Sequence, residues 1–165
     1  MAIILSALAL SLIILALLPK SSVSKEASLA KDFDIKIEYL NPSPDNRPDK
    51  IRNYFGDLKA GEYAKTFIWI ADKYNLPYQL LPAIAMIEST GFKYMISNNG
   101  FGWGCVTDES CIHFDSINQA IEEVGKGLTE GYYASKSAEL KLAIYNFNEG
   151  YPQRVMAIME EIDNL

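Results

Sequence analysis

Positive charge is scarce in this chain of 165 residues. Lys and Arg number 15 against 21 Asp and Glu, which gives a formal net charge of -6 at pH 7. Because affinity for nucleic-acid phosphates comes mostly from clustered basic side chains, the composition excludes a nucleic-acid-binding function. The same shortage removes electrostatic attraction to anionic lipids and anionic wall polymers. Binding to such polymers therefore requires a specific cleft.

Metal-binding residue types are equally scarce. The chain has one histidine, His113, and two cysteines, Cys105 and Cys111, in a short loop that contains Gly and Asp. A cysteine pair with a single histidine is a weak metal signal, so we expect no metal and no cofactor. In an exported chain the two cysteines predict one disulfide, whereas in a cytoplasmic chain they would be free thiols.

The one long apolar run lacks a basic residue before it. Residues 3–18 are almost entirely apolar, and Lys20 and Lys25 follow them. The run suits the core of a signal peptide better than a full membrane span of ~20 residues. We interpret residues 1–30 as a signal peptide, or an N-terminal membrane anchor, plus a leader, and expect an extracytoplasmic location. An uncleaved anchor would instead place the domain in the cytoplasm by the positive-inside rule.

The rest of the chain fits a single domain with a modest core. Residues 31–58 contain an alternating stretch at 32–40 and three prolines within 41–48, which indicates an extended arm and a linker. Residues 59–165 carry apolar positions at helical spacing. We expect helices near 49–55 and 61–74, from about Pro77, after the capping residues Ser116 and Ser137, and from Pro152.

Three details of these helices are open to test. Pro82 predicts a kink or a late helix start. Gly125 and Gly127 either weaken their helix or let another element approach closely. The helix after Ser137 carries its apolar positions at Leu140, Ala143 and Ile144.

The most informative stretch is an apolar run that ends at a carboxylic acid. Residues 80–87 are all apolar, Glu88 follows, and Gly91 is well placed to end the helix. A helix that is hydrophobic all round is buried. Desolvation and the negative end of the helix dipole would both raise the pKa of Glu88, as a general acid requires.

Several motifs within roughly residues 60–162 resemble those of the lysozyme-like superfamily in their order and spacing. The bacterial N-acetylglucosaminidase family has Glu-Ser ending an apolar helix, then Asn-Asn-x-Phe-Gly and Phe-x-Ser-x-x-x-Ala-Ile. The soluble lytic transglycosylase and goose-type lysozyme family has Glu-Ser and later Ala-x-Tyr-Asn followed by Gly and Val. This chain reads Glu88-Ser89, Asn98-Asn99-Gly100-Phe101-Gly102, residues 114–121, Ala143-Ile144-Tyr145-Asn146, Gly150 and Val155.

The resemblance implies a mainly α fold of the lysozyme-like α+β type, with two lobes and a glycan cleft. It implies that Glu88 is the catalytic acid and that Tyr145 orients this acid or the substrate. The implied substrate-binding residues are Ser89, Asn99, Phe101, Gly102, Trp103 and Asn146. The chain departs from both families, since Thr90 intervenes before Gly91 and Gly102-Trp103-Gly104-Cys105 replaces the Gly-Leu-Met-Gln of the transglycosylases.

A glycosidase normally needs a second carboxylate. Asp108 and Glu109, in the loop after the Gly-rich turn, are candidates beside Asp115 and Glu149. The alternative is substrate assistance, in which an acetamido group or a 6-hydroxyl of the substrate replaces that carboxylate. The sequence leaves open whether the reaction is hydrolysis or lytic transglycosylation.

Residues and resemblance together predict a monomeric cell-wall glycosidase that cleaves β-1,4 bonds of an N-acetylated glycan such as peptidoglycan. The first alternative is a non-catalytic glycan-binding or scaffold domain of the same fold. The second is a membrane-anchored structural protein that faces the cytoplasm and has free thiols.

Overall fold

A computed structural model describes residues 44–105 and 110–165, and Asp45–Leu165 form a compact unit. The apolar run at 3–18, residues 31–43 of the predicted arm and linker, and the candidate acids Asp108 and Glu109 lie outside the described residues. Within the two described ranges, no helix is both long enough and apolar enough to cross a membrane.

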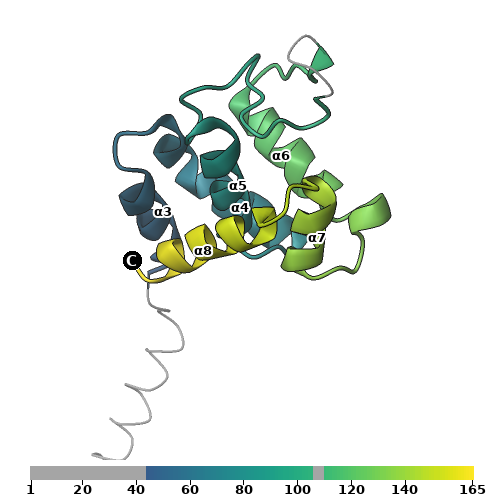
Figure 1. The fold of residues 1–165 in the computed structure, drawn as a ribbon. Coiled ribbons are helices and arrows are strands. Elements are labelled where there is room, and N and C mark those ends of the chain that lie inside the picture. Colours follow the sequence, from purple (N-terminus) through teal and green to yellow (C-terminus); the bar gives the residue numbers. More distant parts are fainter. Residues whose placement is uncertain (1–43, 106–109) are drawn as a thin grey trace, which may run out of the picture. The chain divides into compact units, whose positions relative to one another are not determined.

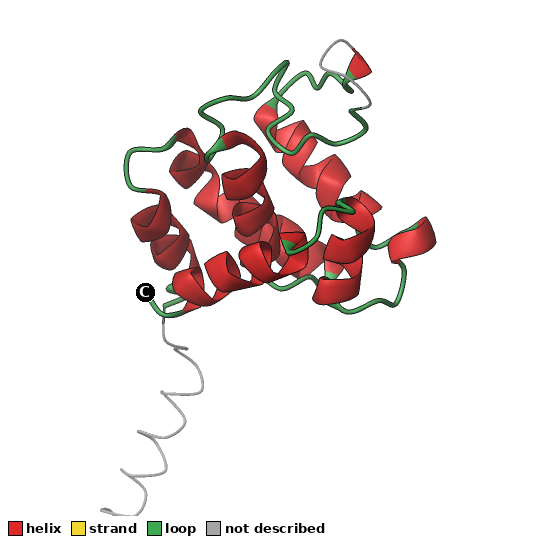
Figure 2. Cartoon of the chain, in the orientation of Figure 1, coloured by secondary structure: helices red, strands yellow, loops and turns green. Residues whose placement is uncertain are grey.

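The described chain is mainly helical, as the sequence predicts (Figures 1 and 2). It contains no strand in these ranges, only an isolated bridge between Ile96 and Asn99, so the β part of the expected fold is not seen there. The elements in chain order are α3 (Arg47–Phe55), η1 (Lys59–Tyr63), α4 (Ala64–Tyr74), α5 (Leu80–Ser89), α6 (Ile117–Gly127), η3 (Gly131–Tyr133), α7 (Ala138–Tyr145) and α8 (Tyr151–Asp163).

Helix α5 is the centre of the core. It packs on α4, α6 and α8, and its residues from Leu80 to Ala85 are all buried. It begins at Leu80 rather than Pro77, so the late start expected from Pro82 is confirmed. The start is possible because Pro82 falls in the first turn, where a backbone N–H has no helical acceptor to lose.

Helices α4 and α6 come close together at a glycine. A Cβ atom added to Gly125 would lie 2.4 Å from the Ile70 side chain, and one added to Gly127 would lie 2.4 Å from the Trp103 ring. Real Cβ atoms do not approach heavy atoms so closely. Both glycines therefore permit close packing, which is the second of the two roles that their positions predict.

The predicted N-caps of α6 and α7 are confirmed. The Ser116 hydroxyl accepts from Gln119 N–H, and the Ser137 hydroxyl accepts from Leu140 N–H. The apolar positions named for α7 do not mark its buried face, because Leu140 is 56% exposed while its neighbours Lys141 and Leu142 are buried. The Lys141 ammonium donates hydrogen bonds to two backbone carbonyls, those of Leu128 and Tyr133, at 2.6 Å each. Because these bonds replace those to water, the lysine can lie on the buried face of α7.

Candidate active site

Glu88 lies in the last turn of α5, where the chain reverses sharply. Thr90, Gly91 and Phe92 follow with φ values of 53°, 61° and 70°, a run of left-handed conformations. Two of the three are not glycine, and a β-branched residue such as Thr90 rarely adopts such a φ. The reversal leads the chain into the loop that runs beside Glu88.

The two oxygens of Glu88 have different surroundings. The Tyr151 hydroxyl, at the first turn of α8, donates to Oε1 at 2.6 Å. Oε2 faces the loop, since a Cβ atom built on Gly102 would lie 3.3 Å from it. Gly102 has a φ of 61° and carries no side chain, so its backbone leaves space beside Oε2.

The half-buried position raises the pKa of Glu88, because burial disfavours the carboxylate more than its neighbours favour it. The hydrogen bond from Tyr151 and the positive charge of Arg154 act in the opposite direction. Burial and the bond to Glu88 also raise the pKa of Tyr151, so its hydroxyl remains a donor. The direction expected for Glu88 from the sequence is thus confirmed.

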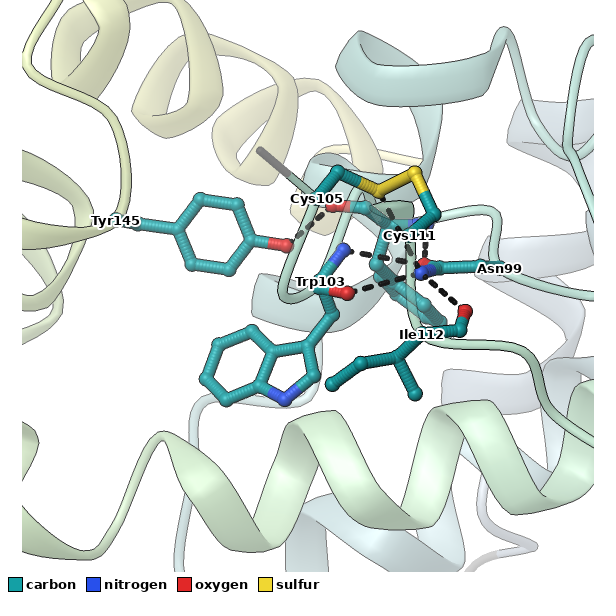
Figure 3. Close-up of a disulfide and its surroundings, with 7 residues drawn as sticks. Asn99, Trp103, Cys105, Cys111, Ile112 and Tyr145 are labelled. Atoms are coloured by element: carbon teal, nitrogen blue, oxygen red, sulfur yellow. Dashed lines mark hydrogen bonds between the residues drawn. A yellow bond between two sulfur atoms is a disulfide. The ribbon is translucent and has the colours of Figure 1, made fainter. Parts of the chain in front are cut away.

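Asn99 holds the loop beside Glu88 in shape (Figure 3). Its buried side chain donates to the carbonyls of Trp103 and Ile112 at 2.9 Å each. It also accepts from the N–H groups of Phe101 and Trp103 at 3.3 and 3.1 Å. The predicted disulfide between Cys105 and Cys111 is present and closes the same loop.

A hollow of about 420 Å³ opens at this loop, lined by Gly102, Trp103, Gly104, Cys105, Tyr133 and Tyr145. The Trp103 ring contacts the Tyr133 and Tyr145 rings at centroid distances of 5.9 and 5.6 Å. Gly102 belongs both to this hollow and to the surroundings of Glu88 Oε2. Glu88 does not line the hollow itself, but Gly102 lies between the acid and the hollow, whose size suits a small ligand.

Tyr145 lies near Glu88 but does not bond to it. Its hydroxyl donates to the carbonyl of Phe101 at 2.5 Å (Figure 3), and burial raises its pKa well above the ordinary value. Its ring stacks on Tyr151, with centroids 6.1 Å apart and planes 6° from parallel. Tyr145 thus positions both the loop and the tyrosine that bonds to the acid.

The other predicted substrate-binding residues divide into three groups. Ser89, Asn99 and Phe101 are buried, and the Ser89 hydroxyl lies 2.7 Å from the Gly100 carbonyl, so these three build the wall of the site. Trp103 is half-buried and lines the hollow. Asn146 caps α7 and accepts from the N–H of Asn148 at 3.0 Å, which ties it to the following loop.

The sequence reasoning missed two residues of the site, Tyr151 and Tyr133. Tyr151 follows Gly150 in the stretch that carries the Tyr145 motif, and this position before Pro152 is the only signal for it. Tyr133 is brought to the hollow by η3, whose place depends on the bonds from Lys141. No periodicity in the sequence indicates that placement.

Among the described residues, no three His, Cys, Asp or Glu side chains cluster as a metal site would require. No protein-family model, curated protein or solved structure matches this chain.

Proposed function

We propose that the protein is a glycosidase of the lysozyme-like type, which cleaves β-1,4 bonds of an N-acetylated glycan, most simply peptidoglycan. One observation carries the proposal: a half-buried glutamate with a raised pKa shares its neighbour Gly102 with a hollow walled by aromatic rings. Aromatic faces suit the apolar face of a pyranose, and a protonated carboxyl suits its glycosidic oxygen. Location outside the cytoplasm is part of the proposal, and the disulfide supports it.

The proposed reaction uses the two Glu88 oxygens for different tasks. Tyr151 donates to Oε1, so that oxygen is held as an acceptor and the acid proton belongs on Oε2. Oε2 faces the space that Gly102 leaves open. A glycan bound with its scissile oxygen in that space would take the proton as the bond to the leaving sugar breaks.

Among the described residues Glu88 is the one carboxyl of the site, and this favours substrate assistance for the rest of the reaction. The charged or hydroxyl groups that perturb the pKa of Glu88 are Tyr151 and Arg154, and no second carboxylate of the described residues is among them. The acetamido oxygen of the substrate would attack the anomeric carbon as the bond to the leaving oxygen breaks, and water or the 6-hydroxyl would then displace the acetamido oxygen from that carbon and release the proton that the carboxylate takes up. Glu88, now a carboxylate, would accept a proton in the second half of the reaction.

The direct test compares the wild type with Glu88→Gln in wall-clearing assays and in chromatography of the released muropeptides. We expect the substitution to lower the rate by about 10²–10⁴-fold, the usual contribution of a general acid. Equal rates for the two proteins would overturn the proposal. The muropeptides also identify the chemistry, because lytic transfer releases anhydro sugars and hydrolysis releases reducing ends.

Gly102→Ala provides a finer test of the Oε2 assignment. The new methyl group would lie 3.3 Å from Oε2, where the substrate oxygen should bind, so we expect activity to fall at least tenfold. Gly56→Ala is the matched control, since Gly56, which follows α3, has a similar φ of 54° but open space around the added carbon. Similar losses of activity in both variants would mean that backbone strain alone explains the effect.

A non-catalytic glycan-binding domain is the second candidate. The absence of a second carboxylate from the surroundings of Glu88, among the residues that the structure describes, favours it. Retention on insoluble peptidoglycan by both the wild type and Glu88→Gln, with no released product from either, would support this alternative.

A further inference from the structure

A second hollow lies between α4 and α6, built from side chains that the site at Glu88 does not use. It measures about 500 Å³ and is lined by Lys65, Thr66, Trp69, Asn118, Gln119 and Glu122. None of these residues lines the hollow at Trp103. Asn118 and Gly127, which contacts Trp103, are nine residues apart on α6, or about 13 Å along its axis.

Trp69 is the unusual member of this set. Its side chain is 56% exposed, although a tryptophan ring is among the largest apolar surfaces that a residue can bury. Within the described chain, no acceptor bonds to its indole N–H. The Lys73 ammonium lies 4.8 Å from the ring centroid, so the ring is held in place while much of it stays accessible.

The polar side chains beside Trp69 are held by hydrogen bonds to their oxygens, and their N–H donors remain unused by the other described residues. Thr66 donates to Asn118 Oδ1 at 3.0 Å, and the Asp115 N–H donates to Gln119 Oε1 at 2.7 Å. Both amide side chains are therefore held by their oxygens. In the described part of the chain their NH₂ groups have no protein partner, so they are available to a ligand.

The charge around the hollow indicates a neutral ligand. Lys73 pairs with Glu122 at 2.5 Å, which leaves Lys65 as the one uncompensated charge among the residues that line the hollow or cover its tryptophan. A phosphate or a nucleic-acid strand would need several unpaired basic groups. A flat aromatic face bordered by amide donors suits a pyranose, whose C–H face is apolar and whose edge carries hydroxyl and acetamido acceptors.

We propose that the Trp69 hollow is a second saccharide-binding site, which holds an N-acetylated pyranose away from Glu88. The choice of an N-acetylated sugar rests on the proposed function. Such a site would retain the protein on a polymeric glycan while Glu88 acts on another segment, and two linked contacts raise the apparent affinity without new chemistry.

Fluorescence can separate the two sites, because the chain has only two tryptophans. In full-length Trp103→Phe protein, emission reports on Trp69 alone, and in Trp69→Phe it reports on Trp103 alone. The probe is tetra-N-acetylchitotetraose, with Glu88→Gln added to both proteins to prevent turnover. We expect saturable quenching or a blue shift of the Trp69 emission.

A second substitution tests the amide donors. Asn118→Asp keeps the oxygen that accepts from Thr66 but removes the NH₂ donors, so we expect it to weaken binding at Trp69 about threefold to tenfold. A Thr66→Ala variant, which loses the internal bond and keeps the NH₂ group, should weaken it less. An effect of Thr66→Ala equal to that of Asn118→Asp would contradict a direct contact with the sugar.

A Trp69 signal that does not change up to millimolar sugar would overturn the second site, whatever Trp103 reports. A response of Trp103 in the same experiment concerns the site at Glu88, so the two proposals can fail independently. Saturation of the Trp69 signal by inorganic phosphate, or its dependence on protein concentration without sugar, would also overturn the proposal. Those results would indicate an anion site or contact with a second copy.

Discussion

At the scale of single residues, Tyr151 controls the acid more directly than Tyr145 does. Tyr151 bonds to Glu88 Oε1, whereas Tyr145 bonds to the Phe101 carbonyl of the loop beside the acid and stacks on Tyr151. The hydrogen bond from Tyr151 lowers the pKa of Glu88 against the larger effect of burial. Removing that bond should therefore change the pH dependence of the proposed reaction.

Tyr151→Phe should raise the pKa of Glu88 further, since it removes a group that favours the carboxylate. Activity that requires the protonated acid would then extend to higher pH, and the alkaline limb of the pH–rate profile would move upward. We expect kcat at the optimum to fall about fivefold, because one orienting hydrogen bond of roughly 1 kcal/mol is lost.

Rates measured across pH with Tyr54→Phe as the control test this prediction, since Tyr54 is a half-buried tyrosine on α3. An alkaline limb that moves to lower pH, or does not move, would contradict the assigned role of Tyr151.

The sequence predicts the position of some side chains at the candidate site and not of others, and the difference has a physical reason. Glu88 is predictable because an uninterrupted apolar run ends at it. Ser89 and Asn99 follow from the motifs, but their burial and their bonds to backbone groups depend on loop geometry that no spacing encodes. Tyr151 is missed because its contact joins two residues 63 positions apart.

At the scale of elements, local sequence signals predict a helix start where the backbone groups at that start bond to residues nearby in the chain. Ser116, Ser137 and Pro82 fix helix starts through contacts within a few residues, and each acts as expected. The face of α7 could not be predicted in this way. Lys141 is buried there because backbone carbonyls outside α7 accept hydrogen bonds from its ammonium group. Hydrophobic periodicity gives no sign of such bonds.

We expect the loop of residues 97–105 to depend more on Asn99 than on the disulfide. Asn99→Ala would remove four bonds to backbone groups, and we expect a loss of about 2–4 kcal/mol in unfolding free energy. Replacing Cys105 and Cys111 by serine reopens a short loop, for which the chain-entropy model gives roughly 2 kcal/mol.

Urea unfolding of both variants measures these two losses. We also expect the Trp103 emission to shift to the red in Asn99→Ala, because its carbonyl and N–H lose the bonds that hold the indole against Gly127. A larger loss in the cysteine variant, with unchanged Trp103 emission in Asn99→Ala, would give the disulfide the leading role instead.

At the scale of the whole molecule, the fold places a carboxyl where its charged form is disfavoured. The folded state raises the pKa of Glu88 above the ordinary value of 4.5. Between these two pKa values the folded protein holds a proton that the unfolded chain has released. The free energy of unfolding therefore falls as pH rises through this window, and the loss persists above it.

Glu88→Gln should remove this dependence, because the amide cannot ionise and its oxygen can still accept from Tyr151. We expect the Tm of Glu88→Gln to match that of the wild type near pH 4, to exceed it increasingly as pH rises, and to keep the difference at alkaline pH. Calorimetry of both proteins across pH measures this, with Glu149→Gln as a control for loss of an exposed charge. A difference that shrinks with rising pH would mean that the fold favours the carboxylate, and an acid of that kind could not hold its proton for a glycan.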